Sequence, residues 1–322
     1  MAGRFELFDR SRLTLKPLAE RVNDLDISTV KPLAPCAGSI DDGLKQTARA
    51  MLAARRRGAP VIFMMGAHVL RAGVQRYLID LMERGLVNCL AGNGACAIHD
   101  YELALIGATT ESVAKYISEG QFGLWAELGE INAALKEGAA RGQGAGETLG
   151  RLIAEGIFPH KEISLLAAAH RLGLPFTLHI GIGSDILHEQ PNCDGAALGA
   201  ASYADFLILA RIVEDLEGGV FANFGSAVTG PEVYLKALAM VRNAAGGSGG
   251  PRRFTTLVCD LHDLPASPDR EADRTQALYF YRPWKTILVR TVSDGGASFY
   301  VRTRHEDSLP ALWTAINDEE KS

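Results

Sequence analysis

The sequence has few cysteines and no excess of positive charge. Five of its 322 residues are cysteine and no two form a Cys-x-x-Cys pair, a pattern typical of reduced, mostly buried thiols rather than a disulfide framework. Lysine and arginine total 33 against 38 acidic residues, a net charge of −5, and the longest basic run is Arg55–Arg57. A nucleic-acid surface needs a concentrated basic stripe, so we expect no nucleic-acid partner.

Long hydrophobic runs are also absent. No apolar stretch reaches the roughly 18 residues that a membrane-spanning helix needs. The N-terminal stretch MAGRFELFDRSR is charged throughout and lacks the apolar centre of a signal peptide. Together with the reduced cysteines, these absences predict a cytoplasmic protein without a membrane partner.

The sequence does contain a regular alternation of strand-like and helix-like segments. Hydrophobic residues make up 47% of the chain and charged residues 22%, which is typical of a globular protein. Short apolar runs that suit strands buried on both faces occur at 59–66, 86–92, 174–181, 220–225 and 254–261. Strand–helix–strand units in series predict a Rossmann-like α/β fold, a doubly wound, mostly parallel sheet with helices on both faces.

The alternation does not extend over the whole chain. The first residues are polar and weakly patterned, so we expect an N-terminal arm over 1–40 that includes a possible contact between copies. A single Rossmann-like domain is expected over 41–322, with a helical insertion at about 110–155.

Polar residues follow each of the five predicted strands. The carboxyl ends of parallel strands lie at one edge of a sheet, where α/β proteins bind ligands, so we expect these residues to line a common crevice. Five of the eight histidines are among them. In chain order they are His68; Asn93, His99 and Asp100; His179, Ser184, Asp185 and His188; Ser226 and Glu232; and Asp260 and His262.

Pairs of glycines lie between three of these strands and the helices that follow. They are Gly92 and Gly94, Gly181 and Gly183, and Gly225 and Gly230. Exposed amides at a helix N-terminus favour an anion, typically a nucleotide phosphate. The sequence has no G-x-x-x-x-G-K-[ST] motif and no G-x-G-x-x-G followed by a distant acidic residue. Three such turns in parallel positions nevertheless predict a dinucleotide site.

Two further patterns leave alternatives open. The histidines after the strands offer ligands suited to zinc or iron, although no H-x-H or H-E-x-x-H pair is present, and we assign no metal ligand. Lys285 follows Trp284 directly. It is either an amine nucleophile that forms an imine or a lysine at a strand edge whose side chain packs over the tryptophan. His99 is a candidate general acid or base, oriented by Asp100.

The order of these motifs resembles the deoxyhypusine synthase family. The resemblance is clearest in GAHVLRAGVQRYLIDLMERGLVNCLAGNGACAIHDYELALIG at 66–107, and continues through RLGLPFTLHIGIGSDI and FGSAVTGPEVYLKALAMVRN to LPALW near the C-terminus. It implies a Rossmann-like NAD-binding fold and a homotetramer with sites between subunits. It also implies a transferase that oxidises a polyamine or related amine with NAD and passes on an aminoalkyl group through an imine on a lysine.

The resemblance assigns roles to the residues named above. NAD would contact His68, Gly92, Asn93, Gly94, Ser184, Asp185, Gly225 and Ser226. Lys285, His99 and Asp100 would be catalytic. Apart from the resemblance, the position of His179, His188, Glu232, Asp260 and His262 after the predicted strands makes them the candidates for contacts with the amine substrate.

The sequence also departs from the family pattern. Where the family has an acidic pair, this sequence has His99-Asp100. Where the family has two histidines after the glycine turn, this sequence has Pro231 and Glu232. The family's Trp-Gly-Lys corresponds to Trp284-Lys285-Thr286. A polyamine site should be anionic, whereas this crevice has imidazoles in place of carboxylates. Two other functions therefore stay open: a metal-dependent hydrolase or lyase that uses the histidine cluster, and a non-catalytic nucleotide-binding homologue.

Overall fold

A six-stranded parallel sheet forms the centre of the computed structural model, which describes residues 3–247, 249–265 and 269–321. Its strands are β2 (Val61–Met65), β3 (Cys89–Asn93), β5 (Phe176–His179), β6 (Val220–Phe224), β7 (Thr255–Asp260) and β8 (Ala297–Arg302). Their order across the sheet is β5-β3-β2-β6-β7-β8. In order of appearance this is 3-2-1-4-5-6, the Rossmann arrangement, so the predicted fold class is confirmed.

The central strand β2 is buried on both faces, as its unbroken apolar sequence predicts. Every residue from Val61 to Met65 has no measurable solvent exposure. Val61, Phe63 and Met65 pack into one hydrophobic cluster, while Ile62 and Met64 pack into a second on the opposite face. This alternation follows from the two-residue period of a strand, and it gives the sheet two apolar faces that helices must cover.

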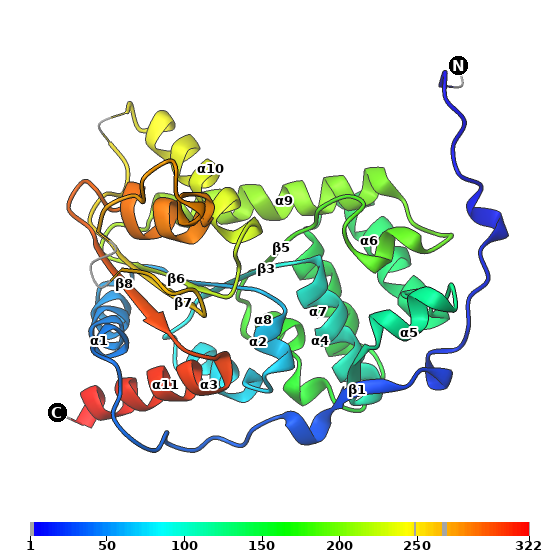
Figure 1. The fold of residues 1–322 in the computed structure, drawn as a ribbon, viewed down its shortest axis with the longest axis horizontal. Coiled ribbons are helices and arrows are strands. Elements are labelled where there is room, and N and C mark those ends of the chain that lie inside the picture. Colours follow the sequence, from blue (N-terminus) through cyan, green and yellow to red (C-terminus); the bar gives the residue numbers. More distant parts are fainter. Residues whose placement is uncertain (1–2, 248, 266–268, 322) are drawn as a thin grey trace.

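The face that is lower in Figure 1 carries most of the helices. The helices α1 (Asp42–Arg57), α4 (Gly94–Ile106), α7 (Ala145–Glu155) and α11 (His305–Lys321) contact the strands, and α2 (His68–Arg71), α3 (Gln75–Glu83) and α8 (Leu165–Leu172) pack around them. The terminal helix α11 returns beside α1. This layer contains the larger of the two hydrophobic clusters.

The upper face is covered by α9 (Gly195–Glu214), α10 (Thr229–Ala244) and a π-helix, Trp284–Arg290 (Figure 1). Among the described helices, α9 is long and apolar enough to cross a membrane by length and composition, with 33% of the apolar window buried. One such helix is weak support for a membrane span, because core helices pass the same test. Here α9 packs on β5 and α10.

The segment between α4 and α8 adds a small second sheet and three helices. The strand β4 (Ala108–Glu111) pairs antiparallel with β1 (Asn23–Asp26) of the N-terminal arm. The helices α5 (Val113–Ser118), α6 (Gly129–Ala140) and α7 follow β4. The predicted division into an arm, a domain and an insertion stays a prediction.

The arm runs along the outside of the molecule and passes below it before α1 begins (Figure 1). It is anchored at Gly73, whose carbonyl accepts a hydrogen bond of 2.7 Å from the Lys31 amide. Gly73 has φ +69°, and a Cβ there would lie 1.9 Å from the Thr29 carbonyl oxygen, so only glycine fits. The same residue divides the helix expected over 69–85 into α2 and α3.

Three elements differ from the sequence-based expectation. Lys285 lies in the π-helix, not at a strand edge. The sixth strand β8 was not expected, because its pattern of small and exposed residues carries no strong strand signal. The pairing of β1 with β4 was also missed, because an arm that pairs across 82 or more residues leaves no local periodicity.

Candidate functional site

Two cavities open at the carboxyl edge of the sheet, near the point where the strand order reverses between β2 and β6. This edge is where Rossmann proteins bind dinucleotides. The first cavity, of about 370 Å³, is bounded by the ends of β3 and β5 and by α9 and α10. The second, of about 530 Å³, is bounded by residues after β2, β6, β7 and β8. We call them the β5-side cavity and the β8-side cavity.

The β5-side cavity combines polar groups with an aromatic wall. It is lined by Asn93, His179, Ile180, Gly181, Ser184, Asp185, Gly199, Ser202, Tyr203, Phe206, Thr229 and Val233. The rings of Tyr203 and Phe206 lie 6.1 Å apart between centroids. His179 is buried, and burial lowers its pKa to about 4, so its imidazole is neutral at pH 7.

Asp185 is the carboxylate of this cavity and lacks a full set of partners. Its Oδ2 atom is buried and has no hydrogen-bond partner in the described part of the chain. It lies against Gly94 at the N-terminus of α4, where a Cβ would be 2.1 Å from Oδ2. Burial raises the pKa of Asp185. A carboxylate held in this way has hydrogen-bonding capacity to offer a ligand hydroxyl.

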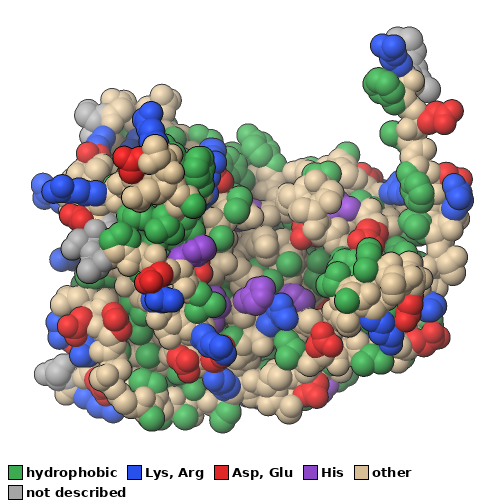
Figure 2. Space-filling view, in the orientation of Figure 1, with side chains coloured by type: hydrophobic (Ala, Val, Ile, Leu, Met, Phe, Trp, Pro, Cys, Tyr) green, Lys and Arg blue, Asp and Glu red, His purple; other side chains and the backbone are tan. Residues whose placement is uncertain are grey.

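The β8-side cavity carries charges of both signs. Its lining comprises Leu25, His68, Arg71, Ala72, Gly225, Asp260, Leu261, Thr303, Arg304, His305 and Glu306. Arg71 Nη1 lies 3.0 Å from His68 Nε2, and burial followed by the Arg71 charge lowers the pKa of His68. Within the described residues, Arg71 Nε and His305 Nδ1 are buried without a hydrogen-bond partner. Figure 2 shows histidine and basic side chains gathered near the middle of one face.

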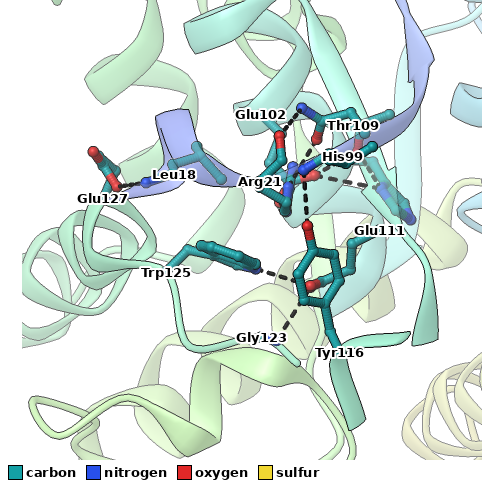
Figure 3. A network of polar contacts seen from close by, with 12 residues as sticks. Leu18, Arg21, His99, Glu102, Thr109, Glu111, Tyr116, Gly123, Trp125 and Glu127 are labelled. Carbon is teal, nitrogen blue, oxygen red and sulfur yellow. Dashed lines mark hydrogen bonds and ion pairs between the residues drawn. The ribbon is translucent and has the colours of Figure 1, made fainter. Parts of the chain in front are cut away.

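A buried polar network lies beside this cavity (Figure 3). Arg21 of the arm forms an ion pair of 2.5 Å with Glu102, and both side chains are almost fully buried. Glu102 Oε2 accepts a hydrogen bond of 2.5 Å from the Thr109 hydroxyl, and Thr109 Oγ1 lies 2.6 Å from His99 Nδ1. Burial lowers the pKa of His99 to about 4 despite the nearby Glu102. His99 is therefore a neutral imidazole at pH 7.

Further contacts in Figure 3 fix the arm next to this network. Glu111 accepts hydrogen bonds from Trp125 Nε1 at 2.9 Å and from the Gly123 amide at 3.1 Å. The Tyr116 hydroxyl accepts one of 2.8 Å from the Val22 amide, next to Arg21. On the other side of Arg21, the Leu18 amide donates a hydrogen bond of 2.7 Å to the Glu127 carboxylate, so the arm is held on both sides of this arginine.

Asp100 does not orient His99 as expected. Its carboxylate accepts hydrogen bonds from the Ser164 hydroxyl at 2.6 Å and from the Leu165 and Leu166 amides at 2.8 and 3.0 Å. It therefore caps the N-terminus of α8. Adjacent residues of a helix point about 100° apart, so His99 and Asp100 face different elements, whereas Glu102, three residues on, shares the His99 face.

Lys285 lines neither cavity. It is 5% exposed in the π-helix, with Nζ 4.0 Å from the centre of the Tyr279 ring. Glu232 forms ion pairs with Lys236 and Arg282 rather than lining a cavity. His262 packs on the Tyr281 ring at 4.1 Å between centroids.

The remaining predicted residues divide between the site and its support. Asn93, Ser184, Asp185 and His179 line the β5-side cavity, and His68, Gly225 and Asp260 line the β8-side cavity. Gly92 lies within β3, and the Ser226 hydroxyl accepts a hydrogen bond of 2.9 Å from the Gly230 amide. The ring nitrogen Nδ1 of His188 lies 2.8 Å from the Asp185 carbonyl oxygen, behind the cavity.

Of the histidines that we considered as metal ligands, His179 lines the β5-side cavity and His68 lines the β8-side cavity, and the other three line neither. Among the described residues, no three histidine, cysteine or carboxylate side chains come close enough together to hold a metal ion. A metal-dependent hydrolase or lyase therefore has no support from the donor geometry.

Several residues of the site were missed. They are Arg21, Arg71, Glu102, Thr109, Arg304 and His305. The i,i+3 spacing of His99 and Glu102 on one helix was an available signal. Arg71 follows a predicted strand like the other candidates. Nothing local marks Arg21, because it reaches the site from the arm through tertiary contacts.

A family model described as the arginine dihydrolase ArgZ-like C-terminal Rossmann fold matches residues 45–158, less than half of the chain. No curated protein sequence matches the chain. The matched segment contains β2, α2, β3 and α4, and therefore His68, Arg71, His99 and Glu102.

Solved structures extend the likeness over most of the fold. A LOR/SDH protein from Methanococcus maripaludis S2 has a TM-score of 0.52 at 15% identity, covering 92% of this chain and 73% of that chain. Unliganded AgrE has a TM-score of 0.52 at 16% identity, and an AgrE variant bound to L-arginine has 0.50 at 16%. This chain is covered to 87% in both AgrE comparisons but spans 33% of the AgrE chain.

At these identities the likeness concerns the fold. It nevertheless corrects the family expected from the sequence, because the matches point to ArgZ/AgrE-like and LOR/SDH-like proteins. The predicted resemblance to deoxyhypusine synthase is wrong. The predicted transferase acting on polyamines is also wrong, since the neighbours are of the arginine dihydrolase and AgrE kind. The sequence-based prediction and the matched proteins agree on an α/β fold with a Rossmann sheet.

Proposed function

We propose that this protein is an NAD-binding enzyme that acts on a small amino acid of the ornithine and arginine class. The observation that carries the proposal is the pair of cavities at the reversal of a 3-2-1-4-5-6 sheet, one polar and aromatic, the other lined by charges of both signs. AgrE, which shares the fold, has been solved with L-arginine and with ornithine and NAD+.

The β5-side cavity fits the adenosine half of NAD. The unpartnered Oδ2 of Asp185 supplies an acceptor for ribose hydroxyls, the role that an acidic residue has in many Rossmann domains. Tyr203 and Phe206 offer faces for an adenine ring. The sequence Gly92-Asn93-Gly94-Ala95-Cys96-Ala97 spans the end of β3 and the start of α4 in the G-x-G-x-x-A pattern, which favours a phosphate at the helix N-terminus.

The β8-side cavity fits a zwitterionic amino acid. Arg71 and Arg304 can hold a carboxylate, and Asp260 and Glu306 can hold an ammonium group. The lone Nε hydrogen of Arg71 is buried without a partner, so a ligand carboxylate would satisfy it. Bound NAD would supply a hydride acceptor, and the residues of this cavity would orient the amino acid and exchange its protons.

Binding of NAD to Asp185→Asn tests the cofactor site. We expect the variant to bind NAD at least about tenfold more weakly by titration calorimetry, because one ribose hydrogen bond to a charged acceptor is lost. Its free energy of unfolding should be unchanged or higher, because burial disfavours the Asp185 charge. Glu189→Gln, at the end of the short helix that begins directly after Asp185 but outside the cavity, is the control and should bind like the wild type.

Wild-type protein that does not bind NAD would overturn the proposed function. Equal affinity of the Asp185→Asn variant would remove Asp185 from the site but leave the cofactor. Turnover is measured as reduced nicotinamide formed with ornithine, arginine and spermidine, and we expect it with an amino acid and not with spermidine. Binding of NAD without turnover would favour the non-catalytic homologue.

A further inference from the structure

His99 belongs to a chain of hydrogen bonds whose protons can be counted. Glu102 forms an ion pair of 2.5 Å with Arg21. It is therefore a carboxylate that accepts hydrogen bonds and donates none. It accepts the single hydroxyl proton of Thr109 at 2.5 Å. Thr109 Oγ1 then has only lone pairs left for His99 Nδ1, which lies 2.6 Å away.

The contact between Thr109 and His99 therefore requires a proton on Nδ1. The neutral imidazole has one ring proton, so Nε2 carries a lone pair. No described residue hydrogen-bonds to Nε2, and the His99 side chain remains 18% exposed. The network thus selects the tautomer whose free nitrogen is a base.

His99 is not itself a lining residue of the β8-side cavity, but it lies next to residues that are. Its electrostatic neighbours Arg71 and His68 both line that cavity, on the helix α2 that packs against α4. On the other side, Thr109 pairs in register with Leu25, which is also a lining residue. His99 is therefore placed between the arm and the cavity.

The backbone directly after Thr109 is strained. Thr110 has φ +68°, and among the described residues it is the one non-glycine with a positive φ. Its hydroxyl is also buried without a partner. Such strain is concentrated at functional sites. Thr110 lies within β4 directly after Thr109, whereas Gly107, with φ +64°, makes the turn from α4 into β4.

We propose that Glu102 and Thr109, held by Arg21 of the arm, are positioning residues that fix His99 as the general base of the β8-side cavity, with Nε2 as the acceptor. The inference rests on the proposed function, which supplies an amine substrate there. A proton leaves the substrate ammonium group and binds Nε2, which gives a neutral amine and an imidazolium. The positive charge on His99 is then stabilised through Thr109 by Glu102.

The first test is the tautomer of His99, read by two-bond ¹H–¹⁵N correlation NMR on protein labelled at histidine, with His99→Gln to assign the signal. In the wild type we expect a protonated Nδ1 and an unprotonated Nε2. Thr109→Val removes only the hydroxyl and should give a mixture of tautomers, whereas Thr109→Ser keeps the hydroxyl and should restore the wild-type spectrum. A wild-type proton on Nε2, or an unchanged spectrum of Thr109→Val, would overturn the inference.

Glu102→Gln gives an opposite, more specific signature. The glutamine oxygen can still accept from Arg21, but its amide then donates to Thr109, so Thr109 donates its proton to His99 Nδ1. The His99 proton is expected to move to Nε2. Retention of the proton on Nδ1 in folded Glu102→Gln would contradict the proton count. If Glu102→Gln does not fold, the comparison of Thr109→Val with Thr109→Ser still tests the inference.

Kinetics separate positioning from structure. Thr109→Val should lower kcat at least about tenfold with KM changed less than about twofold, and Thr109→Ser should recover most of kcat. Arg12→Met, on the same arm but outside the network, is the control. The tautomer of His99 is measured without NAD or substrate. If His99 has the other tautomer but the protein binds NAD, only this inference is refuted. If His99 has the expected tautomer but the protein does not bind NAD, only the proposed function is refuted.

Discussion

At the scale of single residues, the site depends on keeping ionisable groups neutral. His99 and His179 both have pKa values of about 4 because they are buried, so both imidazoles are uncharged at pH 7. Each can then present a ring nitrogen with a lone pair, which a protonated histidine cannot. Burial in the sheet edge thus decides which chemistry these side chains can perform.

The His179 pKa predicts a pH-dependent stability. The folded pKa of about 4 lies below the unfolded value of 6.5, so the unfolded state binds the proton more tightly. The stabilising contribution is therefore present above pH 6.5 and lost as the pH falls toward 4. Between pH 7 and 4.5 we expect wild type to lose about 2 kcal/mol more stability than His179→Gln.

Urea unfolding of both proteins at the two pH values gives this difference directly. The comparison cancels the other titrating groups, among them Asp100, whose raised pKa of about 6 acts in the opposite direction. Parallel pH dependences in the two proteins would show that His179 titrates normally.

At the scale of elements, α4 connects the sheet to two different tasks. Its N-terminus lies beside the β5-side cavity, and its middle turn presents His99 to the network while Asp100 faces the start of α8. The 3.6-residue period of the helix separates these neighbours. The predicted His–Asp pair therefore does not act as a pair. His99 belongs to the buried network, and Asp100 caps the N-terminus of α8.

Removal of the Asp100 cap should destabilise the protein without affecting His99. Asp100→Ala leaves three buried donors of the α8 N-terminus without an acceptor, and we expect a loss of about 2–4 kcal/mol in the free energy of unfolding. Asp194 caps the more exposed N-terminus of α9, so Asp194→Ala is the matched control, at about 1 kcal/mol.

Denaturant titration measures both losses, and the His99 NMR signal provides the second readout. It should keep the Nδ1 proton in Asp100→Ala. A change of tautomer there, with a small change in stability, would return Asp100 to the role expected from the sequence.

At the scale of the whole molecule, the arm is part of the site. Leu18 is 1% exposed in the main core, Arg21 pairs with Glu102, and β1 completes the small sheet. The residues before it differ, since Phe5, Leu7 and Phe8 are 80%, 93% and 68% exposed on a segment that projects from the body (Figure 1). The arm therefore has an anchored part and a free apolar part.

Two truncations should separate these parts. Removal of residues 1–14 should change the free energy of unfolding by less than about 1 kcal/mol, because none of the described residues 3–14 is buried and only the surface hydrogen bond from Arg10 to the Cys193 carbonyl is lost. Removal of residues 1–26 should cost at least about 3–5 kcal/mol, because Glu102 becomes a buried charge without its partner. Thermal and urea unfolding provide the comparison.

The shorter truncation also tests the predicted homo-oligomer. If the exposed apolar residues of the arm contact another copy, light scattering after gel filtration should show a smaller assembly when residues 1–14 are removed. An unchanged mass would mean that the arm does not make the contact.

The sequence by itself determined the layers of this protein and the edge where its polar residues collect. Strand β2 is an unbroken apolar run, and such a run has to be buried on both faces, so the parallel sheet follows from local pattern. His68, Asn93, His179, Asp185, Gly225 and Asp260 then reach the carboxyl edge, because each follows a strand.

Only the tertiary structure decided which of these residues act together. Arg21 and Glu102 are 81 residues apart, and Asp100 meets Ser164 across 64 residues, so neither contact leaves a local pattern. Lys285 illustrates the reverse case, since the lysine of a motif that suggested a nucleophile is buried against the Tyr279 ring and lines neither cavity. Periodicity reports which face a residue occupies, whereas hydrogen-bond partners and protonation depend on what the rest of the chain places opposite that face.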